Sequence, residues 1–313
     1  MSTFKKSLKE GFKGGFMKFT KMHGCGNDYI YVNCFEEKVE DPSAVAIKVS
    51  DVRKGIGSDG LILITPSENA PFMMRIFNAD GSEGKMCGNG IRCVGKYIYD
   101  HGMCGDKTEI DVDTLSGVKK LKLFVNKDTN KVETVRVYMG KAIFKTSEIP
   151  FKKEAMDYKN ISAEISESEN YVKANNNVKV SLLDRDFEFT VLSMGNPHTV
   201  TYVEDTAEFE VEKYGKVSEF LEIYPERVNT EFAHVLNEHE VNMRVWERGS
   251  GETHACGTGA CATAVSTIVN KMAKSPVTVH MLGGDVVIEY DEETRDVYMT
   301  GPAETVCEGE YFY

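Results

Sequence analysis

Apolar residues alternate with polar ones in two short segments that lie far apart in the chain, residues 74–76 and 243–245. Alternation of this kind predicts a strand with one buried face. In both places a polar loop rich in glycine and glutamate follows, and then a cysteine, Cys87 in the first segment and Cys256 in the second. Beyond each cysteine the apolar residues recur at intervals of three and four, which predicts a helix that begins at the cysteine.

The two segments are copies separated by a constant number of positions. Cys87 and Cys256 are 169 positions apart (256 − 87 = 169), and the same interval relates Gly26-Asn27 to Gly195-Asn196. It also relates three further pairs of residues: Arg75 to Arg244, Glu83 to Glu252, and Gly90 to Gly259. An ungapped match at separated places is typical of an internal repeat. We therefore predict a duplicated unit in which each copy presents one cysteine followed by Gly-x-Gly.

A cysteine at the start of a helix is well suited to proton transfer. The unpaired N–H groups and the positive end of the helix dipole stabilise an anion, so the thiol pKa is expected to fall from about 8.5 towards neutrality. The glycines leave N–H groups open to a ligand carboxylate. If the two copies face each other across a pseudo-two-fold axis, one thiolate can remove a proton from a carbon and the opposite thiol can return one to the other face. The pattern thus predicts inversion of a stereocentre by two bases.

Three alternative interpretations of the cysteines are weaker. A lone buried cysteine usually serves as a small apolar side chain, but two cysteines at matched repeat positions disfavour that reading. Cys87 with Cys93, and Cys256 with Cys261, lack the Cys-x-x-Cys spacing of zinc sites, and no His-x-x-x-His follows. The dinucleotide-binding pattern Gly-x-Gly-x-x-Gly is not completed after either cysteine. No metal site is therefore predicted.

Composition and charge narrow the class of protein further. With 313 residues the chain is long enough for two domains with sizeable cores. Its net charge of −12 argues against nucleic acid or an anionic membrane as a partner. Its 8 cysteines are too sparse for a disulfide-dense scaffold. The chain shows neither a secretory signal nor a run of about 20 apolar residues. We expect a cytoplasmic protein with reduced thiols that binds a small molecule.

Four motifs of the chain resemble those of the diaminopimelate epimerase family, whose members are amino-acid epimerases independent of pyridoxal phosphate. They are residues 77–83 (Phe-Asn-Ala-Asp-Gly-Ser-Glu), 87–93 (Cys-Gly-Asn-Gly-Ile-Arg-Cys), 194–198 (Met-Gly-Asn-Pro-His) and 247–259 (Glu-Arg-Gly-x-Gly-Glu-Thr-x-Ala-Cys-Gly-Thr-Gly). The resemblance runs from about Met17 to the C-terminus. It implies an α+β fold of two pseudo-symmetric duplicated domains, each a mixed β-sheet or barrel wrapped round a central helix. It also implies that no cofactor is used and that LL-2,6-diaminopimelate is converted into the meso form, a precursor of lysine and peptidoglycan.

The expected domain organisation combines the residue pattern with this resemblance. Residues 1–16 are expected to form a flexible extension, and residues 17–137 with 302–313 the N-terminal epimerase domain, because the tail of the family returns to that domain. Residues 138–301 are expected to form the C-terminal domain, with a surface insertion at 150–180 and an amphipathic helix at 207–223. The family carries a dimer-interface tyrosine where this chain has Cys307, which weakens the expectation of a homodimer.

The expected site has Cys87 and Cys256 as its two proton-transfer residues. The resemblance implies that His198 lies beside the Cys87 thiol from the opposite domain, and that Glu247 orients a thiol and holds the reacting ammonium. The two helix starts are expected to bind the α-carboxylate through Gly88, Asn89, Gly257 and Thr258. The other expected substrate ligands are Asn27, Asn78, Asn196, Asn229 and Arg248.

The two copies differ where the far end of a substrate is expected to bind. Asn78 and Glu247 occupy equivalent positions, yet one is an amide and the other a carboxylate, and Arg248 is equivalent to Ala79. We expect this asymmetry to distinguish the two ends of the substrate, with Arg248 clamping a carboxylate. Some family members carry a substrate-contacting glutamine where this chain has Gly60, so that contact is in doubt.

Residue types and spacing alone predict only a two-thiol racemase or epimerase of an α-amino or α-hydroxy acid. The diaminopimelate substrate comes from the resemblance. One alternative is another cofactor-independent racemase of the same fold, acting on histidine or proline. A second alternative, from a different class, is a non-catalytic amino-acid-binding or redox module that uses the same cysteines.

Overall fold

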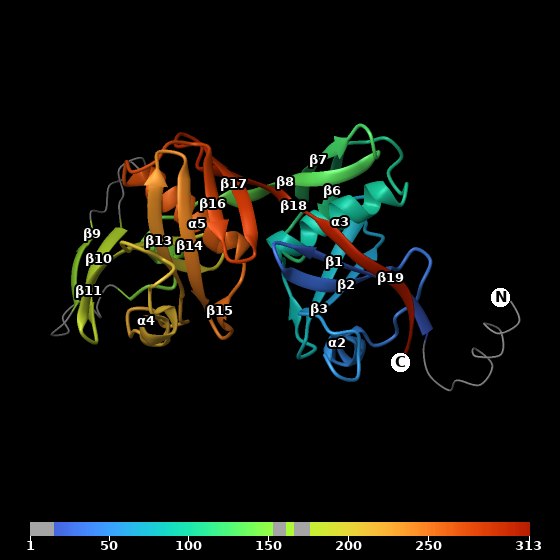
Figure 1. Ribbon diagram of the computed structural model, residues 1–313, viewed down its shortest axis with the longest axis horizontal. Coiled ribbons are helices and arrows are strands. Elements are labelled where there is room, and N and C mark those ends of the chain that lie inside the picture. Colours follow the sequence, from blue (N-terminus) through green and yellow to red (C-terminus); the bar gives the residue numbers. More distant parts are fainter. Residues whose placement is uncertain (1–15, 153–160, 166–175) are drawn as a thin grey trace, which may run out of the picture. The chain divides into compact units, whose positions relative to one another are not determined.

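The computed structural model describes residues 16–152, 161–165 and 176–313, which form two compact units (Figure 1). Unit 1 consists of the residues up to 133 together with 303–313, and unit 2 consists of residues 134–302. The extension expected at residues 1–16 lies outside the described residues except for Phe16, which begins the first strand.

Unit 1 is a mixed sheet built around one helix. Its elements are β1 (Phe16–Gly24), β2 (Asn27–Asn33), α2 (Pro42–Ser50), β3 (Gly60–Thr65), β4 (Phe72–Asn78), β5 (Glu83–Gly84), α3 (Gly88–Asp100), β6 (Glu109–Asp113), β7 (Lys119–Asn126) and β19 (Glu304–Phe312). Hydrogen bonds join the strands in the order β19-β1-β2-β3-β4-β6-β7, with β5 paired to β4. The β2–β3 and β4–β6 pairs are parallel, and the others are antiparallel. Helix α3 packs against β1, β2 and β7.

Unit 2 has the same plan with additional strands. Its elements are β8 (Lys131–Lys141, which begins at the end of unit 1), the 3-10 helix η1 (Thr146–Glu148), β9 (Ile161–Ile165), β10 (Asn176–Leu182), β11 (Arg185–Ser193), β12 (Pro197–Tyr202), α4 (Val211–Ser218), β13 (Asn229–Asn237), β14 (Glu240–Glu247), β15 (Gly251–Thr253), α5 (Gly257–Val269), β16 (Val277–Met281), β17 (Gly284–Tyr290) and β18 (Asp296–Pro302). The ladder runs β9-β10-β11-β12-β13-β14-β16-β17-β18-β8, with β15 paired to β14. Helix α5 packs against β11 to β14 and β16 to β18.

The two units repeat each other at the interval found in the sequence. Helices α3 and α5 each have 13 residues and start 169 positions apart (257 − 88 = 169). The starts of α2 and α4, and those of β1 and β11, differ by the same interval. Each unit also has two matching parallel pairs, β2–β3 with β12–β13 and β4–β6 with β14–β16. The predicted α+β fold of duplicated units, each with a central helix, is confirmed.

The central helices are buried because small and apolar residues cover most of their circumference. In α5 every residue from 260 to 268 is buried, and a helix that is apolar all round belongs in a core. The buried Thr267 hydroxyl donates to the Thr263 carbonyl within the helix at 2.7 Å. In α3, buried Lys96 is paired with Asp100 at 2.8 Å. This enclosure fixes the start of each helix, and therefore the position of each cysteine.

Two predictions about unit 2 are wrong in part. The helix expected at 207–223 is limited to α4. Before its start, the Arg244 guanidinium donates hydrogen bonds to the carbonyls of Thr206, Ala207 and Phe209, which a helix beginning at 207 would use itself. The surface insertion expected at 150–180 contains β9 and β10, which extend the sheet. Val178 on β10 is fully buried. Residues 153–160 and 166–175 of that segment lie outside the described residues.

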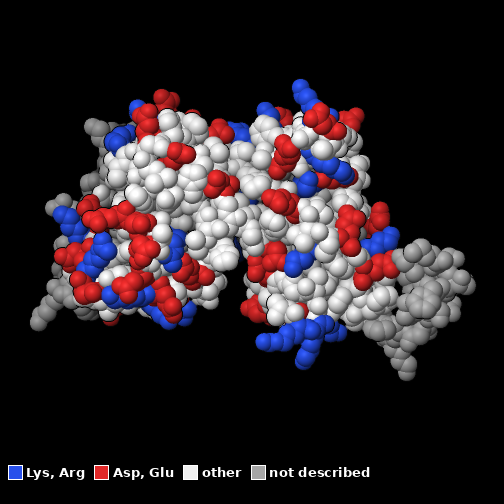
Figure 2. All heavy atoms as spheres, in the orientation of Figure 1, with Lys and Arg blue, Asp and Glu red and all other residues white. Residues whose placement is uncertain are grey.

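The surface carries many charged side chains of both signs. Figure 2 shows acidic and basic groups interspersed on both units, and several of them form ion pairs, such as Lys213 with Asp184 and Glu210 on and beside α4. Among the described residues, none of the helices combines the length and the hydropathy that a bilayer span requires.

Candidate active site

Each candidate cysteine is the N-terminal cap of the buried helix of its unit. The Sγ atom accepts a hydrogen bond from the N–H three positions later, Gly90 at 3.4 Å for Cys87 and Gly259 at 3.3 Å for Cys256. Both glycines are closely packed: a Cβ at 90 would lie 2.6 Å from Ile62 Cδ1, and a Cβ at 259 would lie 2.8 Å from Glu231 Oε1, so either substitution would displace a core side chain. These two N–H groups, which were expected to be open to a ligand, therefore serve the thiols themselves.

The pKa of both thiols is raised, whereas their position at a helix start predicted a lowered pKa. Burial is the largest cause for each, and the N–H groups of Gly90 and Asn89 offset only part of it for Cys87. For Cys256 the negative charges of Glu247 and Glu231 raise the pKa further. The prediction considered the helix dipole but not desolvation, which disfavours the charged thiolate. Both cysteines are therefore favoured as neutral thiols.

Asn27 orients the Cys87 thiol in unit 1. Its Oδ1 accepts hydrogen bonds from the Cys87 Sγ at 3.3 Å and from Asn89 Nδ2 at 3.4 Å. Its Nδ2 donates to Asp59 Oδ2 at 2.6 Å, and the same oxygen accepts from the Asp28 N–H at 3.1 Å. The three predicted residues Asn27, Cys87 and Asn89 thus lie together. Sequence reasoning missed Asp59, for which the available signal was a carboxylate directly before strand β3.

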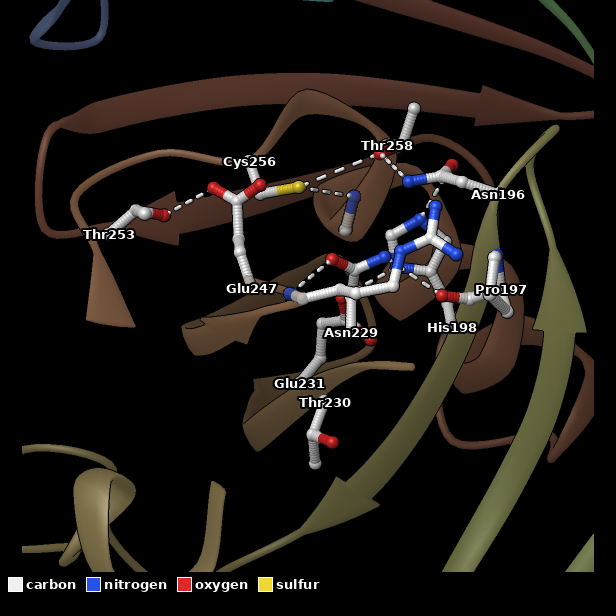
Figure 3. A network of polar contacts seen from close by, with 12 residues as sticks. Asn196, Pro197, His198, Asn229, Thr230, Glu231, Glu247, Thr253, Cys256 and Thr258 are labelled. Carbon is white, nitrogen blue, oxygen red and sulfur yellow. Dashed lines mark hydrogen bonds and ion pairs between the residues drawn. The ribbon is translucent and has the colours of Figure 1, made fainter. Parts of the chain in front are cut away.

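Glu247 and Thr258 surround the Cys256 thiol in unit 2 (Figure 3). The Thr258 hydroxyl lies 3.6 Å from the Sγ. Glu247, at the end of β14, accepts a hydrogen bond from the Thr253 hydroxyl, and its negative charge acts on the Cys256 thiol. Burial raises the pKa of Glu247, although this hydrogen bond and the charge of His198 partly offset that rise. The structure therefore brings three of the predicted residues together around one thiol.

His198 is fully buried between Glu231 and Asn196 in unit 2. Its Nδ1 lies 2.7 Å from Glu231 Oε1, and its Nε2 lies 3.1 Å from Asn196 Oδ1. Asn196 in turn donates to the Thr258 hydroxyl at 3.4 Å. The expected contact between His198 and Cys87 stays a prediction. Glu231 was missed, although its place two positions after Asn229 on a strand puts both side chains on one face.

The residues expected at the far end of the substrate come from both units. In unit 2, Asn229 Oδ1 accepts from the Arg248 N–H at 3.0 Å, and the exposed Arg248 side chain donates to the Glu226 carbonyl at 3.0 Å. In unit 1, Asn78 is exposed and donates to the Ser82 hydroxyl at 3.0 Å. A side chain at Gly60 would not fit, because its Cβ would lie 2.1 Å from the Phe77 carbonyl oxygen.

The cysteines and carboxylates do not gather into a recognisable metal centre. Within the described residues, no group of three or more His, Cys, Asp or Glu side chains is placed to hold a metal ion. None of the 8 cysteines, all of which are described, forms a disulfide.

Solved structures share this fold over almost the whole chain. A phenazine biosynthesis protein of the PhzF family from Bacillus anthracis superposes with a TM-score of 0.67 at 16% identity, covering 96% of this chain and 100% of its own. A hydroxyproline epimerase from Agrobacterium vitis superposes with a TM-score of 0.64 at 12% identity, covering 95% of this chain and 91% of its own. The chain is thus a duplicated α+β protein of the fold class in which such enzymes occur.

Sequence comparison identifies the family within this class. The family described as diaminopimelate epimerase matches residues 19–145 and 190–306. The diaminopimelate epimerase of Agathobacter rectalis is 54% identical over 299 residues, which are 94% of this chain and 99% of that protein. The corresponding enzyme of Acetivibrio thermocellus is 51% identical over 294 residues, 94% of this chain and 98% of that one. The chain therefore belongs to the diaminopimelate epimerase family, and it is an isomerase.

Proposed function

We propose that this protein converts LL-2,6-diaminopimelate into meso-diaminopimelate without a cofactor, with Cys87 and Cys256 as the two proton-transfer residues. Membership of the family supports the reaction. The observation that carries the assignment of the cysteines is their equivalence: each caps the enclosed helix of one of two duplicated units. No other cysteine pair is related by the 169-position interval.

In the proposed reaction one cysteine acts as a thiolate and the other as a thiol. The thiolate removes the proton from Cα, and the electron pair of the broken C–H bond is delocalised into the α-carboxylate. The opposite thiol then donates its proton to the other face of Cα, so the two sulfurs exchange roles and the configuration inverts. Donors at the helix starts, at Gly88-Asn89 and Gly257-Thr258, stabilise the growing negative charge. Losing one such donor typically costs on the order of 10²–10³ in rate.

The raised pKa of both thiols fits the difficulty of this proton transfer. A Cα proton is a weak acid, and a thiolate that is desolvated is a stronger base than one in water. Formation of that thiolate needs an acceptor for the thiol proton. We propose Glu247 for this role at Cys256, because its charge acts on the thiol and burial raises its own pKa. We propose His198 for the corresponding role at Cys87, on the basis of the family resemblance.

We propose that side chains that differ between the two units distinguish the two ends of the substrate. Asn27 and Asn196 lie beside the two helix starts and are proposed to bind the reacting amino-acid end together with Glu247. Asn78, Asn229 and Arg248 are proposed to bind the far end. Arg248 supports this role because its side chain is exposed, and because a guanidinium can hold a carboxylate through two hydrogen bonds.

The test is to incubate the protein with LL-diaminopimelate in heavy water and to follow both deuterium at Cα and the meso product. The wild type is expected to incorporate solvent deuterium as the meso form appears. Cys87→Ala and Cys256→Ala are each expected to abolish epimerisation. Cys93→Ala and Cys261→Ala are the matched controls, since each removes a fully buried thiol from the same helix. Near-normal turnover in Cys87→Ala or Cys256→Ala would defeat the two-base assignment.

The alternatives give different results in the same assay. Another racemase of this fold would turn over histidine or proline faster than diaminopimelate, so a panel of amino acids decides the substrate. A non-catalytic amino-acid-binding or redox module would show no deuterium at Cα with any of them.

We also propose that the protein is cytoplasmic and that it forms a homodimer. Strand β19 supports the assembly, because within the described residues it pairs only with β1 and its residues 304–308 are exposed. An exposed strand edge is a common site of association between chains. Light scattering that gives the 35.0 kDa of a single chain would contradict the dimer.

A further inference from the structure

Glu219, at the C-terminal end of α4, is a buried carboxyl group that three donors of unit 2 contact. Its side chain is 5% exposed. Its Oε2 accepts a hydrogen bond from the Trp246 indole N–H at 2.8 Å. Its Oε1 accepts from the Gly249 N–H at 2.9 Å and from the Arg227 guanidinium at 3.4 Å. The side chain therefore links α4 to the turn that follows β14.

The directions of these hydrogen bonds are fixed by the chemistry of the donors. An indole N–H, a backbone N–H and a guanidinium can each only donate. Both oxygens of Glu219 must therefore accept. A glutamine at position 219 has the same shape, but its NH₂ group would face a donor on one side or the other. Glu219→Gln thus loses at least one of the three contacts.

The turn that Glu219 contacts carries Arg248. Residues 248–250 lie between the end of β14 and the start of β15, outside the ladder that joins these strands. Side chains from elsewhere in unit 2 bind two consecutive N–H groups of this turn: Asn229 Oδ1 accepts from Arg248 at 3.0 Å, and Glu219 accepts from Gly249. These contacts fix the backbone from which the exposed Arg248 side chain extends.

Glu247, the neighbour of Arg248, is held by different contacts. It pairs with Gly251 in the β14–β15 ladder, and its side chain accepts a hydrogen bond from the Thr253 hydroxyl. A change at Glu219 is therefore expected to displace Arg248 more than Glu247. Recognition of the far end of the substrate can thus be perturbed separately from the reacting end.

Unit 1 has a hydroxyl group at the position equivalent to Glu219. Position 219 corresponds to Ser50 and position 227 to Ser58, 169 positions earlier, and the hydroxyl oxygens of these serines lie 3.3 Å apart. The repeat thus keeps a contact between these two positions in both units, but only in unit 2 is it an ion pair, that of Arg227 with Glu219. The acceptor that reaches the turn is therefore specific to unit 2.

The equivalent turn of unit 1 is supported from within. Asp80 stands at the position equivalent to Gly249, and its carboxyl group accepts hydrogen bonds from the Ser82 N–H at 2.9 Å and from the Ser82 hydroxyl at 2.6 Å. Gly249 has no side chain for this purpose, so its turn depends on Glu219. The turn that is supported from outside is the one that carries Arg248.

We propose that Glu219 is a positioning residue for substrate recognition, which holds the turn at residues 248–250 so that the Arg248 guanidinium meets the carboxylate at the far end of the substrate. This inference rests on the proposed role of Arg248. Glu219 acts through the backbone and does not touch the substrate. Bidentate binding of a carboxylate by a guanidinium depends on the relative orientation of the two groups. A displaced Arg248 therefore keeps its charge but loses affinity for a ligand with a second carboxylate.

Glu219→Gln tests this role through substrate recognition. The KM for LL-diaminopimelate is expected to rise about 10- to 100-fold while kcat changes by less than about 3-fold, because Glu247 keeps its own supports. Competitive inhibition by L-lysine, which has no carboxylate at its far end, is expected to stay as in the wild type. A general loss of structure would weaken both ligands and lower kcat.

Trp246→Phe is the matched control, and it also provides a rescue. Alone it removes one donor from Glu219 but keeps the contact with Gly249, and unit 1 has Phe77 at the equivalent position. Its KM is expected to stay near that of the wild type. In the double variant no indole N–H faces the glutamine NH₂ group, so the glutamine oxygen can accept from Gly249. The KM of Glu219→Gln/Trp246→Phe is therefore expected to return towards that of Trp246→Phe.

Arg248→Met decides whether Glu219 acts through Arg248. If it does, Glu219→Gln raises KM by less than about 2-fold in the Arg248→Met background. An equal rise in both backgrounds overturns the proposal, and so does an unchanged KM, or a fall in kcat at unchanged KM, in Glu219→Gln. An unchanged KM in Arg248→Met refutes the role of Arg248 itself and this inference with it, which is a different result from an unchanged KM in Glu219→Gln alone.

Hydrogen exchange measured by NMR tests the support of the turn without substrate. The Gly249 amide is expected to exchange about 10-fold faster in Glu219→Gln than in the wild type, with the Ser82 amide of unit 1 as the unchanged reference. Equal rates at Gly249 overturn the proposal, whether or not the protein epimerises diaminopimelate. If Glu219→Gln does not fold, Glu219→Asp replaces it, because its shorter side chain cannot span Trp246 and Gly249 where they stand.

Discussion

Arg244 is expected to be far more important for stability than its repeat partner Arg75. Both arginines donate through Nε to a glutamate eight positions later, Glu252 and Glu83, at 2.7 Å. Arg244 also donates through a second nitrogen to three backbone carbonyls, at 2.7, 3.2 and 2.9 Å, in the segment before α4. Its side chain is 18% exposed, against 36% for Arg75. We therefore predict unequal effects of the same substitution, Arg→Met.

The magnitude follows from these contacts. A partly exposed ion pair contributes about 0–1 kcal/mol, and Arg75→Met is expected to cost no more than that. Each hydrogen bond from a charged donor contributes about 1.5–3 kcal/mol when buried. The three carbonyls share one donor nitrogen, and in the variant water can replace part of the lost hydrogen bonding. We therefore expect Arg244→Met to lower the free energy of unfolding by about 2–4 kcal/mol. For a unit of this size that corresponds to a fall in melting temperature of roughly 4–16 °C.

Unfolding of unit 2 can be followed by the fluorescence of Trp246, the 1 tryptophan of the chain. This residue is buried and donates to Glu219 at 2.8 Å, so its emission is expected to change when unit 2 unfolds. Urea titrations of the two variants and the wild type, followed by fluorescence and by circular dichroism, give the comparison. Equal losses in Arg75→Met and Arg244→Met, or a loss below about 1 kcal/mol in Arg244→Met, would refute the reasoning.

Three further substitutions test the two sites. Gly259→Ala places a methyl group 2.8 Å from Glu231 Oε1. It is expected to displace the start of α5 and to lower kcat by about 10², and wild-type kcat would contradict the packing argument. Glu247→Gln is expected to be inactive yet more stable than the wild type at pH 7. Folding raises the pKa of the Glu247 carboxyl group, so the fold loses stability as the pH rises above the usual carboxyl pKa of 4.5. Urea titrations should show that this gain disappears below about pH 4, and equal stability at pH 7 would contradict it. Asp59→Ala removes the acceptor that holds Asn27 at 2.6 Å and is expected to lower kcat/KM by about 10- to 100-fold; an unchanged value would mean that Asn27 needs no support.

The repeat made much of the fold predictable from the sequence. Cys87 and Cys256 lie at equivalent positions of the repeat, so the same local structure is expected after each. Helices α3 and α5 start directly after these cysteines and have the same length. Alternating and periodic apolar residues also placed strands such as β16 correctly. The start of α4 could not be predicted, because the carbonyls before it are bound by Arg244, which lies 35 to 38 positions further along the chain.

The residues around each cysteine were predictable in kind but not in detail. Asn27 and Asn196 were found because they recur in the repeat, and each lies beside the start of a central helix. Glu231 and Asp59 have no charged counterpart 169 positions away, so the repeat gave no signal for them. The direction of the thiol pKa shifts was wrong because the depth at which a helix start is buried depends on the whole surrounding sheet.

The pairing of β19 with β1 has a consequence for biosynthesis. These strands form the antiparallel ladder that pairs Phe16, the first described residue, with Phe312. The ribosome synthesises β1 before unit 2 and β19 after it, so one edge of the unit 1 sheet remains unpaired while unit 2 is translated. The half of the molecule that is made first is therefore the half that is finished last.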